Sequence, residues 1–196
     1  MVDDFQKDYS RDELVLIGYD LPDSEFFTRS EYYDILGVPT VCGNGLSDVW
    51  PVTEANLSGD YDAHSAVASP LQMTVYQTGP ARFKAEIYAE QAVGGAVFVM
   101  AAVEDDVVTA YGGGTSHLPY HWRTFMTSPT GDAFSIAAGE TVEIEKSFQV
   151  EPGWEYKTMG VVCWVQRDGG TNPSPQPNIP TRHEVLQAAY APTSGA

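Results

Sequence analysis

The chain has 196 residues, of which 43% are hydrophobic and 12% aromatic, so it can bury a sizeable core and is not a disordered chain. Ten basic residues stand against 27 acidic ones, which leaves a formal net charge of −17. A negative field of this strength repels phosphate backbones and anionic lipids. The composition therefore excludes nucleic acid as a charge-driven partner, and divalent cations are the partner class that the charge favours.

The sequence contains no segment suited to crossing a membrane. No apolar run approaches the ~18 residues that a membrane-spanning helix needs. The first residues also lack the basic and apolar regions of a signal peptide. We therefore expect no membrane insertion by this chain.

The N-terminal quarter of the chain has the pattern of an α/β segment. Apolar spacing predicts a short helix over Val2–Tyr9, a strand over Leu14–Asp20 and a second helix over Thr28–Leu36. Another strand is expected to begin at Pro39. It should end in a tight hairpin turn, because Gly43–Gly45 reads Gly-Asn-Gly.

From Leu71 onward almost every periodic segment is typical of a strand. In ARFKAEIYAE the apolar residues alternate strictly with polar ones, which indicates one buried and one wet face. The apolar set is Phe83, Ala85, Ile87 and Ala89. In TVEIEKSFQV the same alternation is broken by Lys146, so we expect that strand at an edge. About eight short strands without intervening helices predict a mainly β fold, an immunoglobulin-like antiparallel β-sandwich.

These patterns divide the chain into four parts. We expect an α/β segment over 1–50, a linker over 51–69, the β-sandwich over 70–192 and a disordered tail over 193–196. The proline-rich stretch Gly169–Thr181 should connect the last two strands without joining a sheet centrally, because proline donates no ladder hydrogen bond.

The large aromatic residues favour packing roles. We expect a set of rings to fill the sandwich core and its ends: Trp122, Phe125, Trp154, Tyr156 and Trp164. Trp50 is our candidate for packing the two parts of the chain together. Cys42 and Cys163 lie in apolar strand-like runs, where a buried free thiol is the usual case. The sequence does not decide whether these two cysteines form a disulfide with each other.

Five segments, taken in order, resemble one known family. YYDILGVPTVCGNG, AVFVMAAVEDD, PYHWRTFMTSPTGDAF, VVCWVQRD and HEVLQAAYA are similar in order and spacing to the twenty-eight-kilodalton outer membrane protein family of the bacterial cell envelope. The resemblance implies a truncated thioredoxin-like segment followed by a sandwich, and a place in the cell envelope or outside the cell. It also implies that the thioredoxin CxxC would lie upstream of this chain, and that Pro39 is a structural cis-proline.

Candidate metal ligands are few. Two acidic clusters could turn oxygens toward one calcium ion; they comprise Asp60 and Asp62, and Glu104, Asp105 and Asp106. Neither has the spacing of an EF-hand, so solvated turns are the favoured interpretation of both clusters. His117 and His121 are four residues apart, but Pro119 between them removes the helix that a zinc pair needs, so we expect ordinary surface or loop histidines.

The sequence offers no catalytic constellation. It has no nucleophile elbow and no phosphate-binding glycine loop. We therefore expect a non-catalytic interaction or assembly protein whose partner is another protein or a second copy of itself. Two alternatives remain open: the remnant of a thiol–disulfide protein, and a sandwich that binds calcium or a glycan.

Overall fold

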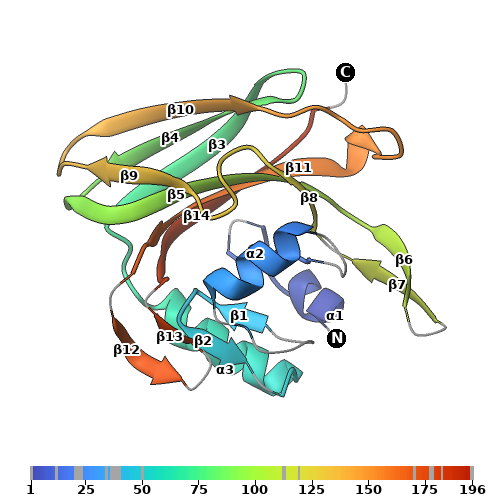
Figure 1. Cartoon of the computed structure of the whole chain (residues 1–196), viewed down its shortest axis with the longest axis horizontal. Helices are drawn as coiled ribbons and strands as arrows, with labels where there is room; N and C mark the ends of the chain where they lie inside the picture. The colour runs from blue at the N-terminus through green and yellow to red at the C-terminus, as the bar shows by residue number, and fades with distance from the viewer. Residues whose placement is uncertain are drawn as a thin grey trace.

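The computed structural model arranges the chain in three layers. It describes residues 2–11, 13–19, 24–33, 35, 41–49, 51–111, 114–118, 120–169, 171–176, 179–181 and 183–194. A small antiparallel sheet lies above a larger one, and the N-terminal helices lie below the larger sheet (Figure 1). The mainly β antiparallel sandwich preceded by an α/β segment is therefore confirmed.

The larger sheet is the middle layer. Its strands are β5 (Val93–Glu104), β8 (His121–Phe125), β9 (Asp132–Ile136), β11 (Met159–Arg167) and β14 (Val185–Pro192). The order is β14-β11-β5-β8, and β9 also pairs with β5. β8 and β9 share one edge of the long β5, because β9 pairs with its first half and β8 with its second. All pairs within this sheet are antiparallel.

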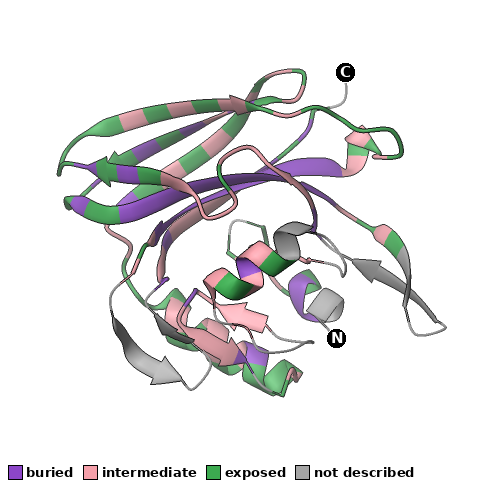
Figure 2. Cartoon of the chain, viewed as in Figure 1, coloured by how far each residue is buried: buried purple, intermediate pink, exposed green. Residues whose placement is uncertain are grey.

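β5 and β11 are buried on both faces. Phe98 and Met100 point into the sandwich core, whereas Val97 and Val99 belong to a second core on the opposite side. Figure 2 shows both strands coloured as buried along most of their length. Continuous apolar runs such as AVFVMAAV and GVVCWVQ are typical of strands that are covered on two sides.

The small sheet is buried on one face only. It consists of β3 (Leu71–Gly79), β4 (Arg82–Ala89) and β10 (Thr141–Ser147), in the order β10-β4-β3. The predicted alternation in β4 is confirmed, because all four apolar side chains from Phe83 to Ala89 are fully buried. Lys146 lies on β10, which is an edge strand as predicted, and its ammonium binds Asp132 of β9 at 2.8 Å.

The N-terminal layer has its own small core. Its elements are α1 (Val2–Lys7), α2 (Ser24–Tyr32), the hairpin β1 (Val41–Gly43) and β2 (Ser47–Val49), and α3 (Glu54–Ser65). Phe5, Val49 and Leu57 are buried together at its centre. The predicted hairpin turn is confirmed, since Asn44 and Gly45 have φ angles of 48° and 67°.

Two predictions for the first seventy residues are wrong. Residues 51–69 are not a plain linker, because they contain α3, which begins at the N-cap Thr53 and packs against α1 and β2. Its sequence EANLSGDYDAHS buries only Leu57, so it lacks the apolar stripe that reveals a helix. Leu14–Asp20 is not a ladder strand within the described residues; Gly18 makes one parallel bridge to His121.

Two short ribbons lie outside the layers. β6 (Val107–Tyr111) pairs with β7 (Gly114–Leu118), and β12 (Thr171–Gln176) pairs with β13 (Ile179–Thr181). The second ribbon belongs to the proline-rich stretch, which joins neither large nor small sheet, as proline predicts. A single 3-10 turn, Tyr156–Thr158, precedes β11.

The start of the predicted disordered tail is ordered. Thr193 is buried, its N–H donates to the Met159 carbonyl at 3.0 Å, and its hydroxyl donates to the Tyr156 carbonyl at 2.6 Å. The Ser194 N–H donates to Gln77 Oε1 at 2.6 Å. The prediction over 193–196 is wrong at these two residues, because backbone and side-chain partners from three other segments hold them.

Three of the five aromatic residues lie elsewhere than predicted, whereas Tyr156 lies at an end of the sandwich, where its hydroxyl accepts from Gln77 and from the Ala81 N–H. Trp122, Phe125 and Trp164 belong to the core between the larger sheet and the N-terminal layer, not to the sandwich core. Trp154 and Tyr156 are half-buried beside the start of β11. Trp50 is outside the described residues.

We predict that β4 tolerates substitution on one face only. Ile87→Ala should lower the free energy of unfolding by about 2–5 kcal/mol, because it leaves a cavity between the two sheets. Tyr88→Ala changes the neighbouring side chain, which is 40% exposed, and should cost less than about 1 kcal/mol. Urea denaturation followed by circular dichroism measures both. Equal losses would contradict the one-sided burial of this sheet.

Candidate functional site

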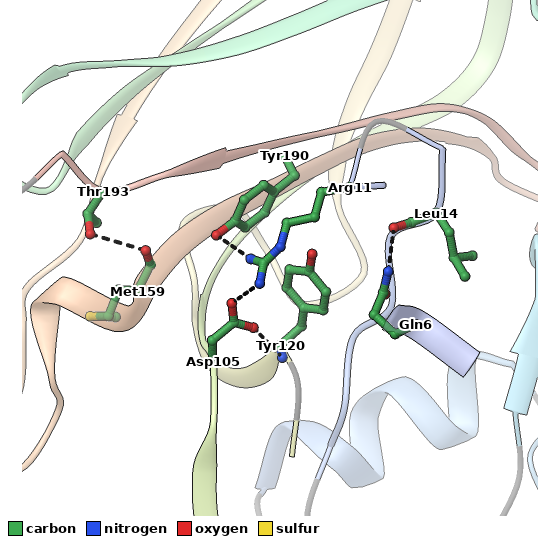
Figure 3. A network of polar contacts seen from close by, with 8 residues as sticks. All are labelled: Gln6, Arg11, Leu14, Asp105, Tyr120, Met159, Tyr190 and Thr193. Atoms are coloured by element: carbon green, nitrogen blue, oxygen red, sulfur yellow. Dashed lines mark hydrogen bonds and ion pairs between the residues drawn. The ribbon is translucent and has the colours of Figure 1, made fainter. Parts of the chain in front are cut away.

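A clamp on Arg11 ties the N-terminal layer to the larger sheet. The Arg11 guanidinium donates to the Tyr190 hydroxyl at 2.8 Å and forms an ion pair with Asp105. It also lies over two aromatic rings, at 4.5 Å from the Tyr120 centroid and 5.0 Å from that of Tyr190 (Figure 3). Asp105 accepts in turn from the Tyr120 N–H at 3.1 Å. One arginine thus connects the segment after α1 with the strand ends of the sandwich.

The clamp needs a glycine beneath it. A Cβ on Gly160 would lie 2.5 Å from ring atoms of Tyr190, closer than any side chain tolerates. Tyr190 can therefore lie across β11 only because position 160 carries no side chain. Figure 3 also shows the two flanking hydrogen bonds that fix neighbouring backbone, Gln6 to Leu14 and Thr193 to Met159.

The acidic calcium candidates are engaged with protein groups. Glu104 is buried, pairs with Arg123 at 2.7 Å and accepts from the Glu155 N–H at 3.0 Å. Asp105 belongs to the Arg11 clamp. Asp106 forms the turn between β5 and β6 with a φ of 57°. The adjacent carboxylates of this cluster thus serve separate structural contacts.

The second acidic cluster lies in the N-terminal layer. Asp60 accepts a hydrogen bond from the Ser47 hydroxyl and lies 3.4 Å from His64 Nε2, whereas Asp62 is exposed. Among the described residues no three His, Cys, Asp or Glu side chains gather as metal ligands would. Calcium binding by either cluster stays a prediction.

The redox positions can be placed only in part. Pro39 and its peptide bond lie outside the described residues. Both cysteines are free thiols: Cys42 is partly buried on β1, and Cys163 is fully buried in the sandwich core, 3.3 Å from Met73 Sδ. Burial raises the pKa of Cys42 to about 12 and also raises the pKa of Cys163. A thiol with so high a pKa is a poor nucleophile at neutral pH.

The sequence patterns did not lead us to predict the buried polar cluster around Arg29. Arg29 of α2 is 3% exposed, and its guanidinium lies 4.6 Å from the Tyr33 ring centroid and 5.5 Å from that of Trp164. It donates to the Pro129 carbonyl at 2.9 Å and to the Tyr33 hydroxyl at 2.5 Å. Gln166 of β11 completes the cluster by accepting from Trp164 Nε1 at 2.5 Å.

The signal for this cluster was present in the sequence. Tyr32 and Tyr33 follow Arg29 at three and four residues, a spacing that brings side chains together on one helix face. His183 packs against the Tyr32 ring at 4.0 Å and is buried, and His121 is buried too. The prediction of surface or loop histidines is therefore wrong at His121, which is buried on β8, whereas His183 lies in a loop as predicted but is buried against α2.

The outer face of the small sheet is exposed on all three of its strands. Tyr76 on β3 and Tyr88 on β4 are 41% and 40% exposed. Charged residues lie between them: Lys84 pairs with Glu143 at 2.8 Å across β4 and β10. Figure 2 shows exposed and covered residues alternating along β10 and β3. Nothing among the described residues covers this face, and it is our candidate interaction surface.

Comparison with known proteins supports the fold. No protein-family model matches the chain, and no curated protein matches its sequence. Among solved structures it is similar to HBP35 of Porphyromonas gingivalis, with a TM-score of 0.64 and 16% identity over 88% of this chain and 60% of that chain. It is also similar to protein AGR_C_4864 from Agrobacterium tumefaciens, with a TM-score of 0.52 and 14% identity over 90% of this chain and 74% of that one.

A third solved structure is more distant. A domain of the outer membrane lipoprotein Omp28 from Porphyromonas gingivalis matches 64% of this chain and 88% of that chain, with a TM-score of 0.37 and 10% identity. At the identities of HBP35 and the Agrobacterium protein, a shared fold is what the likeness establishes. The chain spans about 60% of the length of HBP35. No described helix is long and apolar enough to cross a membrane.

We predict that both thiols react slowly in the native protein. At pH 8 the thiolate fraction of Cys42 should be at least about a hundredfold below that of an unperturbed cysteine, because burial raises its pKa to about 12. Ellman's reagent measures the rate, and guanidinium-unfolded protein is the control in which both thiols react fast. A native thiol that reacts at the unfolded rate would contradict this environment.

We predict that the Arg11 clamp contributes measurably to stability. Arg11→Gln removes the ion pair and the two ring contacts, and should lower the free energy of unfolding by about 1–2 kcal/mol. Arg82→Gln is the matched control, because its ion pair with Glu145 is exposed and 4.0 Å long; it should cost less than about 0.5 kcal/mol. Urea denaturation measures the free energy of unfolding of both variants. An equal loss in both would contradict a stabilising contribution of the Arg11 clamp.

Proposed function

We propose that this chain is a non-catalytic interaction module of the cell envelope or of the extracellular space, and that it binds or assembles with protein. The observation that carries the proposal is the unequal covering of the two sheets. The larger sheet is buried on both faces, whereas the small sheet leaves its outer face and the β10 edge exposed. A free sheet face and a free strand edge are surfaces on which other chains dock.

The placement in the envelope rests on resemblance. The five sequence segments that resemble the twenty-eight-kilodalton outer membrane protein family run from the N-terminal layer to β14. The likeness to HBP35 supports the same order of an N-terminal α/β layer and a sandwich. Since fold alone does not carry function, the interaction role is argued from the exposed sheet and not from these likenesses.

The environments of the two cysteines give the thiol–disulfide alternative less support than the interaction role has. Both cysteines are free, Cys163 lies in the sandwich core whereas Cys42 lies on β1, and burial raises the pKa of each. Neither has a resolving cysteine within the described residues. Redox chemistry would therefore require cysteines other than Cys42 and Cys163.

Glycan binding is a second candidate function of the same surface. Tyr76 and Tyr88 point to the outer face, and the register places them four residues apart along β4, or about 13 Å. Exposed rings so spaced on one face of a sheet can stack on two non-adjacent sugars of a neutral oligosaccharide. Binding of a neutral oligosaccharide that is lost in both Tyr76→Ala and Tyr88→Ala would favour this function over protein binding.

The proposed function is tested on the intact protein. Size-exclusion chromatography with light scattering reports self-association, and chemical cross-linking in envelope extract, read by mass spectrometry, identifies contacting proteins and residues. We expect a specific partner, or a second copy, to be cross-linked to the small sheet. A strictly monomeric protein without reproducible cross-links would contradict the proposal.

A further inference from the structure

The free edge of the small sheet belongs to β10. β10 pairs with β4 alone, and β3 closes the opposite edge by lying beside β14. The Phe148 N–H donates to the Ala81 carbonyl at 3.1 Å, and the Ala89 N–H donates to the Glu140 carbonyl at 3.0 Å. Even-numbered residues of β10 therefore bond to β4, since bonded pairs alternate along an antiparallel ladder.

The odd-numbered residues of β10 direct their backbone groups away from β4. These residues are Thr141, Glu143, Glu145 and Ser147, and all four are exposed. Within the described part of the chain, no backbone hydrogen bond joins their outward N–H and C=O groups to another segment. A row of unsatisfied donors and acceptors of this kind is a template for one further strand.

A second copy of this chain is a poor occupant of that edge. Every antiparallel register that pairs most of β10 with itself places Glu143 or Glu145 opposite a glutamate of the other copy. Like charges directly opposite each other destabilise a strand pair. Glu143 lies opposite Glu86 of β4 and has one counter-ion, Lys84, at 2.8 Å on the β4 side, so a glutamate of a second copy on the other side would meet it without a cation between them. The edge is thus protected against self-pairing by its own charge.

The same charges select a basic partner strand. Glu143 and Glu145 contact Lys84 and Arg82 of β4 at 2.8 and 4.0 Å, yet their side chains stay 53% and 43% exposed. A lysine or arginine of an added strand would share these carboxylates from the free side of the sheet. On the inner face Val142 and Ile144 are partly buried against the sandwich core, so the alternate positions of the added strand would be apolar. The segment that can accept an added strand ends before Lys146. The Lys146 ammonium lies on the inner face, bound to Asp132, and a charge at this position is unfavourable beside an apolar side chain of the added strand.

We propose that the β10 edge, along Thr141–Glu145, binds an extended segment of another protein in which lysine or arginine alternates with apolar residues. The added strand completes the small sheet as a fourth, antiparallel or parallel member. This inference rests on the proposed function and deepens it, because it names the docking edge and the chemistry of the partner.

The test uses a capped Lys-Val-Lys-Val-Lys peptide and, as its charge-reversed control, Glu-Val-Glu-Val-Glu. Each is titrated into ¹⁵N-labelled full-length protein. We expect the basic peptide to shift the amides of Thr141, Glu143 and Glu145 most and to slow their hydrogen exchange, with binding that weakens as salt is added. The acidic peptide should leave these amides unchanged.

Two variants separate backbone pairing from charge. Glu145→Pro removes the carboxylate and also an outward N–H that β4 does not use, whereas Glu145→Gln removes the charge alone. The proline variant should therefore abolish binding that the glutamine variant only weakens, while the fold, checked by circular dichroism, persists in both. The double variant E143Q/E145Q should weaken binding about threefold to tenfold. Its matched control is E54Q/D62N, which removes the same charge from exposed positions on α3 and should bind as the unmodified protein does.

Several outcomes would overturn the inference. They are equal binding of both peptides, the largest amide shifts outside β10, and undiminished binding by either Glu145→Pro or E143Q/E145Q. Failure of the proposed function is distinguishable, because it would appear as the absence of any specific cross-link to the intact protein. A partner cross-linked equally to the unmodified protein and to Glu145→Pro would leave the interaction role standing and remove the β10 edge from it.

Discussion

The two-sided burial of β5 and β11 is the constraint on which the rest of the structure depends. Their side chains are apolar on both faces, and the removal of this surface from water stabilises the fold at roughly 25 cal/mol per Å². One face is covered by the small sheet and the other by the N-terminal layer. The sandwich as observed is therefore not self-sufficient, because the N-terminal layer covers apolar surface that would otherwise meet water.

Specific polar contacts fix the layers in one arrangement. Arg11 and Arg29 both come from the N-terminal layer, and each guanidinium lies among aromatic rings and hydrogen-bond acceptors of the sandwich. The β1–β2 turn adds a backbone bond from the Val185 N–H to the Asn44 carbonyl at 2.9 Å. At least six of the ten basic residues form ion pairs with acidic side chains in the part of the chain that the structure describes. The cations thus serve structural contacts, and the excess acidic charge lies at the surface.

The unequal covering of the two sheets also relates the architecture to the proposed role. A sheet covered on both faces has little backbone or side-chain surface to offer, whereas a sheet covered on one face can present the other. The small sheet has that position, and β10 is its open edge. The absence of a partner strand along Glu143 and Glu145 is compatible with a stable free protein, because their charges discourage pairing between copies. The acidic side chains of β10 and its position at the sheet edge together favour a basic partner strand.

Residue periodicity by itself determined the sandwich. Strict alternation in β4, the lysine on edge strand β10 and the apolar runs of β5 and β11 each follow from local burial, which leaves its period in the sequence. Only the tertiary structure decided where Trp122 and Trp164 pack, that α3 joins the N-terminal layer, and that Arg29 and His183 are buried. Apart from α3, which packs on α1 and β2, those outcomes depend on contacts between segments about a hundred or more residues apart, and no local pattern encodes which distant surface a side chain meets.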